Sequence, residues 1–275
     1  MLKYRLISFP LLLLMAFLVV LWREGGAWIF AALVIPVTVA AVLESCNIAA
    51  RLGMQPLRIT AVLAAVLLMA KYALGDKLLE YRAYLPNGAW VVAILFTVLM
   101  LATLFMRDRE KAVKAAFVTP GVVLLPVIVL LPLAKIYFEY GSMMFLMLVL
   151  CTKASDTGGY IVGMLSNKVM KNGNHKIVPS ISPKKSWEGT VGAALFSMIT
   201  ALCFAFNSWW ICLIFGFLAF LGSFAGDLTE SQLKRVSEIK DSGSWIPGMG
   251  GILDVIDSFI YNAPLFYLVL ESGGF

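Results

Sequence analysis

The chain has 275 residues, of which 61% are hydrophobic and 14% charged, and its formal net charge is +6. Its mean hydropathy of +0.89 and its repeated apolar runs of about twenty residues exclude a soluble domain. We therefore expect an all-α, polytopic integral membrane protein.

The apolar segments predict about nine transmembrane helices. The first follows a basic start, but bulky residues stand where a signal-peptide cleavage site needs small ones, so we interpret it as a retained helix. Lys and Arg gather in the connections on one side, which predicts a cytoplasmic N-terminus. The expected helices cover residues 6–22, 26–43, 57–75, 88–106, 117–135, 141–165, 189–206, 208–233 and 250–270.

Polarity is distributed unevenly along the chain. Residues 1–140 are hydrophobic segments with short connectors, and we expect them to form a scaffold with access for lipid. Residues 141–275 contain the long cytoplasmic loop 166–187 and every chemically suggestive motif, so we expect the catalytic site there. We expect His175 to be solvated and the cysteines to be small packing residues. These cysteines are Cys46, Cys151, Cys203 and Cys212.

The first motif is CTKASDTGGYIVG, in which Lys153 and Asp156 stand three residues apart in an apolar segment. On a helix they face each other, and an ion pair within a membrane helix indicates a functional site by default. The alternative is a pair that only fixes helix packing. Gly158, Gly159 and Gly163 would allow a helix or a ligand to approach the backbone closely.

The second motif is SISPKKSWEGTVG, residues 180–192. Ser182 followed by Pro183 predicts a helix entry, and Lys184 and Lys185 offer adjacent ammonium groups for phosphate oxygens. The alternative is a solvated anchor at the end of a membrane helix.

The third motif lies within residues 226–258, where charged residues crowd together. If residues 227–238 are helical, one face carries the polar side chains. These are Asp227, Glu230, Ser231, Lys234, Arg235 and Glu238. The glycine-rich KDSGSWIPGMGG that follows predicts a turn or a re-entrant loop.

Two further carboxylates, Asp254 and Asp257, stand three residues apart near the start of the last apolar segment. On one helix face they repel each other, and a divalent cation would compensate both charges. Hard oxygen ligands suit Mg²⁺, with Asp227 as the third ligand.

The stretch SQLKRVSEIKDSGSWIPGMGGILDVID, residues 231–257, resembles the signature of the phosphatidate cytidylyltransferases, also called CDP-diacylglycerol synthases. SDTGGYIVG and SISPKKSWEG resemble the segments that precede it in that family. The resemblance implies transfer of a cytidylyl group from CTP to phosphatidic acid for phospholipid synthesis. It also implies a bacterial inner membrane location with the active site facing the cytoplasm. Met249 and Val255 depart from the histidine and arginine usual in the family, which we interpret as divergence within the family, with an altered nucleotide site as the alternative.

The resemblance also implies roles for individual residues and for ligands. Mg²⁺ is the expected cofactor, with room for a second cation, and CTP, phosphatidic acid and membrane lipids are the expected partners. A homodimer is compatible with the resemblance, and no nucleic-acid partner is expected. The catalytic residues would be Lys234, Arg235, Lys240 and Asp241, the substrate-binding residues Asp156, Ser182, Lys184, Lys185, Glu188 and Ser231, and the metal ligands Asp227, Asp254 and Asp257.

Two alternative functions are compatible with part of this pattern. A CTP-dependent polyprenol or phytol kinase would share the membrane helices and the metal–phosphate chemistry, but would move the γ-phosphoryl group. A secondary transporter would use the buried charges as an ion path, yet it would interrupt helices in both halves of the chain. Here all the polar interruptions lie in the C-terminal part.

Overall fold

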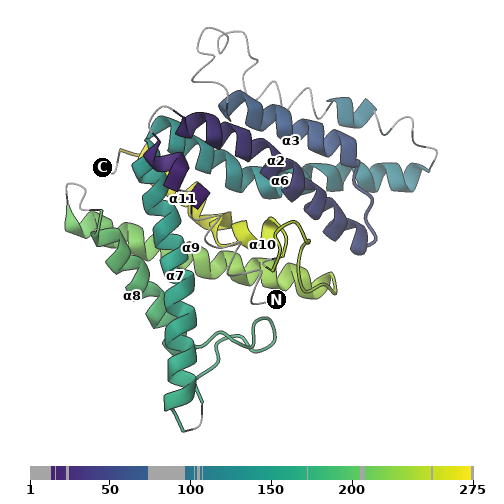
Figure 1. Cartoon of the computed structure of the whole chain (residues 1–275). Helices are drawn as coiled ribbons and strands as arrows, with labels where there is room; N and C mark the ends of the chain where they lie inside the picture. The colour runs from purple at the N-terminus through teal and green to yellow at the C-terminus, as the bar shows by residue number, and fades with distance from the viewer. Residues whose placement is uncertain are drawn as a thin grey trace. The chain divides into compact units, whose positions relative to one another are not determined.

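The structure is a computed structural model that describes residues 14–15, 17–22, 25–73, 97–101, 103, 106, 108–171, 173–204, 208–248 and 250–273. Within these ranges the regular elements are helices, accompanied by two isolated β-bridges (Figure 1). Most of the expected helices 6–22 and 88–106, and Met249, lie outside the described residues.

The described part of the chain confirms an α-helical fold with candidate membrane spans. Four helices in it are long and apolar enough to cross a membrane: α2 (Gly26–Arg51), α6 (Arg109–Glu139), α7 (Ser142–Val169) and α9 (Trp209–Val236). The shorter helices are α3 (Arg58–Ala73), α8 (Trp187–Leu202), α10 (Leu253–Ile256) and α11 (Phe259–Glu271). The count of nine and the cytoplasmic N-terminus stay predictions.

The single helix expected over 250–270 is wrong in its first part. Residues 250–252 belong to a loop, α10 has only four residues, and a turn at Asp257 and Ser258 precedes α11. Asp254 and Asp257 therefore do not project from one continuous helix.

The contacts divide the chain into two compact units, each described by itself. Unit 1 comprises Met1–Phe138 and Val236–Val255, and unit 2 comprises Glu139–Arg235 and Ile256–Phe275.

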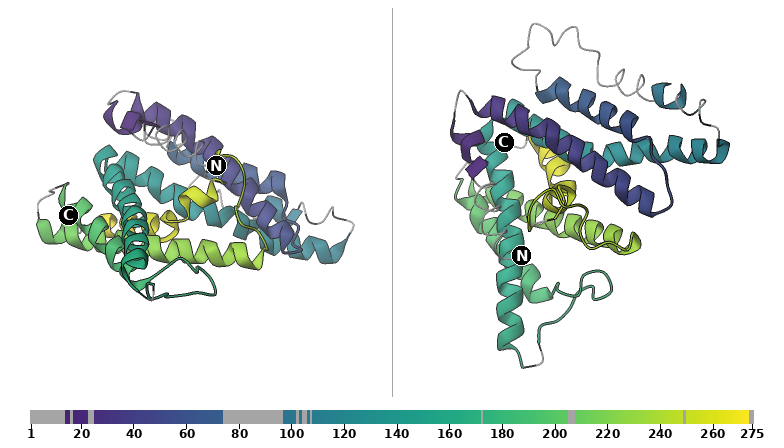
Figure 2. Two further views of the ribbon diagram at one scale, coloured as in Figure 1. Left: turned by 60° about the horizontal axis from the view of Figure 1, so that its bottom comes forward. Right: turned by 45° about the vertical axis from the view of Figure 1, so that its right-hand side comes forward.

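In unit 1, α2, α3 and α6 lie side by side (Figures 1 and 2). Small apolar side chains such as Val42, Ala61 and Val123 fill their shared core, which lets the helices approach closely. The Thr119 hydroxyl on α6 accepts a hydrogen bond of 3.0 Å from the Leu57 amide, which is a free donor at the start of α3.

In unit 2, a seam of glycines joins α7 to α8. A Cβ atom at Gly189 would lie 2.9 Å from the Gly159 carbonyl oxygen, and one at Gly192 would lie 2.9 Å from the Gly158 carbonyl oxygen. Because contacts this short leave no room for a side chain, the two backbones touch directly. The close approach predicted for the α7 glycines is confirmed.

Helices α9 and α11 complete unit 2. A Cβ atom at Gly222 or Gly226 on α9 would collide with Asn262 or with the Asp257 carbonyl. The Asn262 amide donates hydrogen bonds to the Ala219 carbonyl at 2.8 Å and to the Thr152 hydroxyl on α7 at 3.0 Å. These contacts fix α7, α9 and α11 against one another.

Candidate active site

Unit 2 contains a cavity of about 510 Å³ between α7, the 170–186 loop, α8 and α9, called the α7–α9 cavity below. This volume is typical of a site for a small molecule. Several predicted site residues line the cavity, namely Asp156, Ser182, Lys184, Lys185 and Asp227. The structure therefore brings together side chains from all three sequence motifs.

Lys185 connects the second motif to α9. Its ammonium group lies 2.7 Å from Oδ2 of Asp227, donates to the Phe224 carbonyl at 3.2 Å and lies 4.3 Å from the centre of the Phe224 ring. Its side chain is only 16% exposed, whereas Asp227 is 41% exposed. Lys185 is thus a fixed charge in the cavity wall.

Asp156 accepts hydrogen bonds from three elements of unit 2. Its Oδ1 accepts from the Ser223 hydroxyl on α9, and its Oδ2 accepts from the Ser258 hydroxyl at 3.0 Å and from Lys153 at 3.1 Å. The predicted pairing of Lys153 with Asp156 is confirmed. Asp156 therefore fixes helix packing as well as lining the cavity.

Three further lysines in the cavity wall are Lys168, Lys176 and Lys184. None of them has a carboxylate within 4.0 Å among the described residues, in contrast to Lys185. With Asp156 and Asp227 as the carboxylates of the wall, the lining carries excess positive charge. An excess of this kind favours a ligand with several negative charges.

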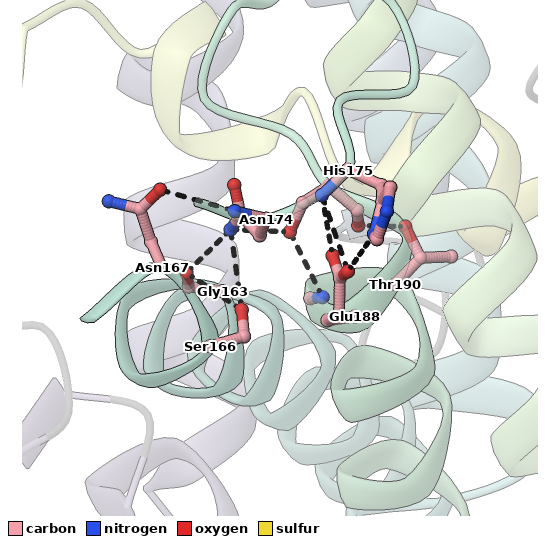
Figure 3. A network of polar contacts seen from close by, with 9 residues as sticks. Gly163, Ser166, Asn167, Asn174, His175, Glu188 and Thr190 are labelled. Carbon is pink, nitrogen blue, oxygen red and sulfur yellow. Dashed lines mark hydrogen bonds and ion pairs between the residues drawn. The ribbon is translucent and has the colours of Figure 1, made fainter. Parts of the chain in front are cut away.

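The loop between α7 and α8 is held by Asn174, a residue that the sequence analysis did not single out (Figure 3). Its side-chain amide nitrogen contacts the Gly163 carbonyl at 2.8 Å, the Ser186 hydroxyl at 3.0 Å and the Ser166 hydroxyl at 3.3 Å. Ser186 caps α8, because its hydroxyl accepts from the Gly189 amide at 3.2 Å. The helix entry predicted at Ser182 is therefore wrong, since α8 begins at Trp187.

His175 and Glu188 face each other across the same loop (Figure 3). His175 is exposed, as predicted, but its Nδ1 lies 2.7 Å from Oε1 of Glu188, and its amide donates to that carboxylate at 3.2 Å. The hydrogen bond from the His175 side chain lowers the pKa of Glu188 to about 2. Glu188 does not line the cavity, so its role in binding substrate stays a prediction.

The C-terminal part of α9 carries the first half of the signature. Lys234 pairs with the buried Glu230 one turn earlier, Ser231 is half-buried, and Arg235 is exposed. The helix ends at Val236, and Glu238 has a left-handed φ of 55°. The helix expected over 227–238 is therefore two residues too long, because Glu238 lies beyond its end.

The second half of the signature forms a loop in unit 1, as the glycine-rich sequence predicts. Ile246 and Gly250 form an antiparallel bridge, with amide-to-carbonyl distances of 3.0 and 3.1 Å. Asp254 closes the loop by accepting from the Ser242 amide at 2.9 Å and from the Gly251 amide at 2.6 Å. Lys240 and Asp241 precede these contacts and are exposed.

The three predicted metal ligands are divided between the units, with Asp254 in unit 1 and Asp227 and Asp257 in unit 2. Among the described residues, no group of three or more His, Cys, Asp or Glu side chains is arranged to hold a metal ion. In unit 2, Asp227 and Asp156 both repel the buried carboxylate of Asp257. Carboxylate oxygens are the ligand type that Mg²⁺ prefers, so the chemistry of these side chains, although not their arrangement, fits the ion. Ligation by these residues stays a prediction.

The structure thus defines an α-helical membrane protein with a cavity suited to a polyanion. Sequence comparison then places it: the chain belongs to the Cytidylyltransferase family, whose sequence model matches residues 3–272.

Individual relatives carry a more specific name. The chain is 40% identical over 139 residues to a phosphatidate cytidylyltransferase of Mycobacterium bovis, covering 49% of this chain and 44% of the relative. It is 41% identical over 122 residues to the enzyme of that name in Staphylococcus haemolyticus, covering 42% and 44%. It is 50% identical over 126 residues to phosphatidate cytidylyltransferase 5, chloroplastic, of Arabidopsis thaliana, covering 44% and 30%. The matches span less than half the length of these relatives.

Proposed function

We propose that this protein transfers the cytidylyl group of CTP to phosphatidic acid, forming CDP-diacylglycerol and pyrophosphate. The observation that carries the proposal is the α7–α9 cavity, whose wall combines four lysines with Asp156 and Asp227 in a chain of the Cytidylyltransferase family. The names of the relatives support the choice of phosphatidic acid as the acceptor.

In the proposed reaction, a phosphate oxygen of phosphatidic acid forms a bond to the α-phosphorus of CTP. The bond from that phosphorus to the bridging oxygen of the β-phosphate breaks, and pyrophosphate leaves with the electron pair. The attacking monoester has a second pKa of about 6, so at neutral pH it is already largely ionised. The enzyme therefore has little need of a general base and must mainly align two polyanions that repel each other.

The lysines of the cavity suit this task. Lys185 is held rigidly by Asp227 and Phe224, so it can offer a charge at a fixed position. Lys184 is exposed beside it and can follow the phosphates as they move. A bound Mg²⁺ would neutralise phosphate charge further, with Asp227 and Asp257 as its ligands in unit 2. The resemblance of the signature to the family adds Lys234, Arg235, Lys240 and Asp241 as further proposed catalytic residues.

We further propose about nine membrane helices, with the N-terminus and the active site on the cytoplasmic side of a bacterial inner membrane. The distribution of Lys and Arg among the connections supports this orientation. CTP is a cytoplasmic metabolite, and the 170–186 loop beside the cavity is rich in lysine, as cytoplasmic loops are. A homodimer can be tested by measuring the mass of the detergent-solubilised protein.

The function is tested with purified protein, phosphatidic acid and Mg²⁺, using CTP labelled at either the α- or the γ-phosphorus. Cytidylyl transfer moves only the α-label into the lipid extract. A CTP-dependent lipid kinase, tested with polyprenol and phytol as acceptors, would move only the γ-label. A transporter would move neither label into lipid, and it would carry substrate into liposomes without consuming nucleotide. Absence of α-label from the lipid would refute the proposal.

A further inference from the structure

Glu44 is a buried carboxylate that the sequence analysis did not connect with the signature. It lies in the membrane helix α2, and 1% of its surface is exposed. A carboxylate inside a membrane helix is costly unless it is hydrogen-bonded, and it indicates a function.

Among the described residues, the hydrogen-bond partners of Glu44 all belong to the 242–253 loop of the signature, about 200 residues away in the sequence but in the same unit. Its Oε1 accepts from the Ile252 amide at 2.9 Å. Its Oε2 accepts from the Leu253 amide at 2.8 Å and from the Ser242 hydroxyl at 3.1 Å. The loop therefore closes around the carboxylate by backbone as well as side-chain contacts.

Two glycines make room for this carboxylate. A Cβ atom at Gly243 or at Gly251 would collide with the Glu44 side chain. Because both loop segments contact Glu44 through glycine, any other residue there would push the carboxylate away from its donors. The glycine-rich composition of the loop thus has a specific cause in addition to turn formation.

The same loop residues also hold Asp254. The Ser242 amide donates to Asp254, while the Ser242 hydroxyl donates to Glu44. Three successive amides are divided between the same two carboxylates. The Gly251 amide donates to Asp254, and the amides of residues 252 and 253 donate to Glu44. A displacement of Glu44 would therefore move Asp254 through one shared set of donors.

We propose that Glu44 is a positioning residue, which holds the 242–253 loop of unit 1 in shape so that Asp254 is correctly placed. This inference rests on the proposed function in so far as Asp254 serves the reaction. It assigns a direct task to α2, in the part of the chain that the sequence analysis treated as scaffold.

Glutamine at this position is a sharp test of the idea. A carboxylate only accepts hydrogen bonds, whereas an amide has one accepting oxygen and one donating nitrogen. In Glu44→Gln the side chain keeps its volume, but its nitrogen must face either the Ile252 amide or the donors of Leu253 and Ser242. The loop then loses part of its anchor without the creation of a cavity.

The experiment compares Glu44→Gln with Ser45→Ala, a matched control in the same turn of α2. Ser45 is also buried, but within the described part of the chain its hydroxyl bonds only to the Ala41 carbonyl of its own helix. Ser242→Ala, which removes one donor to Glu44, and the Glu44→Gln/Ser242→Ala double variant complete a cycle. For each variant we would measure the melting temperature in detergent, kcat and KM for CTP, and the Mg²⁺ concentration that gives half-maximal rate. Amide hydrogen exchange of residues 242–253 gives a readout that does not depend on activity.

We expect Glu44→Gln to lower kcat by about tenfold to a hundredfold, the range expected for a displacement near 1 Å, with little change in KM for CTP. Faster exchange in residues 242–253 and a higher Mg²⁺ requirement should accompany the loss, while Ser45→Ala behaves as wild type. Ser242→Ala should lower kcat by less than Glu44→Gln does. In the double variant the two losses of kcat should not add, because both changes weaken the same contact. If Glu44→Gln does not fold, Ser242→Ala alone must show the faster exchange and the lower kcat.

Normal kcat in Glu44→Gln, or a loss of activity with unchanged exchange in the loop, would overturn the proposal. A wild-type protein without cytidylyl transfer would instead refute the proposed function. In that case the exchange data would still decide whether Glu44 holds the loop.

Discussion

Replacement of Lys185 by methionine tests whether the α7–α9 cavity handles phosphate. Methionine keeps most of the side-chain length and packing but removes the charge. The change breaks the 2.7 Å ion pair with Asp227 and the hydrogen bond to the Phe224 carbonyl. It also deprives any bound phosphate of the best-fixed lysine in the cavity wall.

The size of the effect follows from burial. Breaking a fully buried ion pair costs about 3–5 kcal/mol, and an exposed pair contributes about 0–1 kcal/mol. Lys185 is 16% exposed and Asp227 is 41% exposed, so this pair lies between those limits. We therefore expect the free energy of unfolding to fall by about 2 kcal/mol. A hydrogen bond to a charged group contributes about 1.5–3 kcal/mol, so removal of the Lys185 ammonium from a phosphate in the transition state should lower kcat/KM about thirtyfold, which corresponds to about 2 kcal/mol.

The assay is incorporation of α-labelled CTP into lipid, at varied CTP and at varied phosphatidic acid. Lys114→Met is the matched control, because Lys114 also pairs with a carboxylate, Glu110, but is 58% exposed and lies in unit 1. Lys114→Met should leave kcat/KM nearly unchanged. Equal losses in both variants would show that bulk positive charge matters, and an unchanged kcat/KM in Lys185→Met would refute the phosphate-binding cavity.

Four further predictions follow from the remaining features. Asp227→Ala should abolish lipid labelling, and activity within tenfold of wild type, about 1.4 kcal/mol, would contradict metal ligation. Gly192→Leu should lower the melting temperature in detergent strongly, because a side chain there collides with Val162 across the glycine seam; an unchanged melting temperature would disprove that packing. Since the pKa of Glu188 is lowered to about 2, the stability that it adds is complete above pH 4.5 and is lost only as the pH falls through 2. The difference in melting temperature between wild type and Glu188→Gln should therefore shrink as the pH falls from 4.5 towards 2, and a difference that does not change in that range would contradict the assignment. The wild type should be active despite Met249, and Met249→His should change the rate by about tenfold or less, since the acceptor is already ionised; an inert wild type that Met249→His activates would reverse this view.

Hydropathy predicted the helices in the described residues but not their ends. α2 continues to Arg51 instead of residue 43, and α6 begins at Arg109 instead of residue 117. Apolar content shows where a chain can contact lipid, whereas a helix continues for as long as its backbone hydrogen bonds do. The end of α7 at Val169 differs from the prediction for the same reason.

The sequence motifs predicted much of the cavity wall, since Asp156, Lys184, Lys185 and Asp227 all line it. Local spacing could not predict the partners of Asn174 or Glu44, because these partners depend on tertiary contacts. Glu44 did carry a detectable signal, as a lone carboxylate inside an apolar segment. To assign a role to Glu44 from this signal, one would have had to know that residues 242–253 fold around its carboxylate.

The glycine seam between α7 and α8 has a consequence for selectivity. Where two backbones touch, no side chain is present that could change rotamer to accommodate a larger or differently shaped ligand. This wall of the cavity is therefore stiff, whereas side chains such as Phe224 on α9 and Lys184 in the loop can adjust. Changes of ligand preference should arise from substitutions on that adjustable side, because widening the cavity at the seam would require separating the two helices.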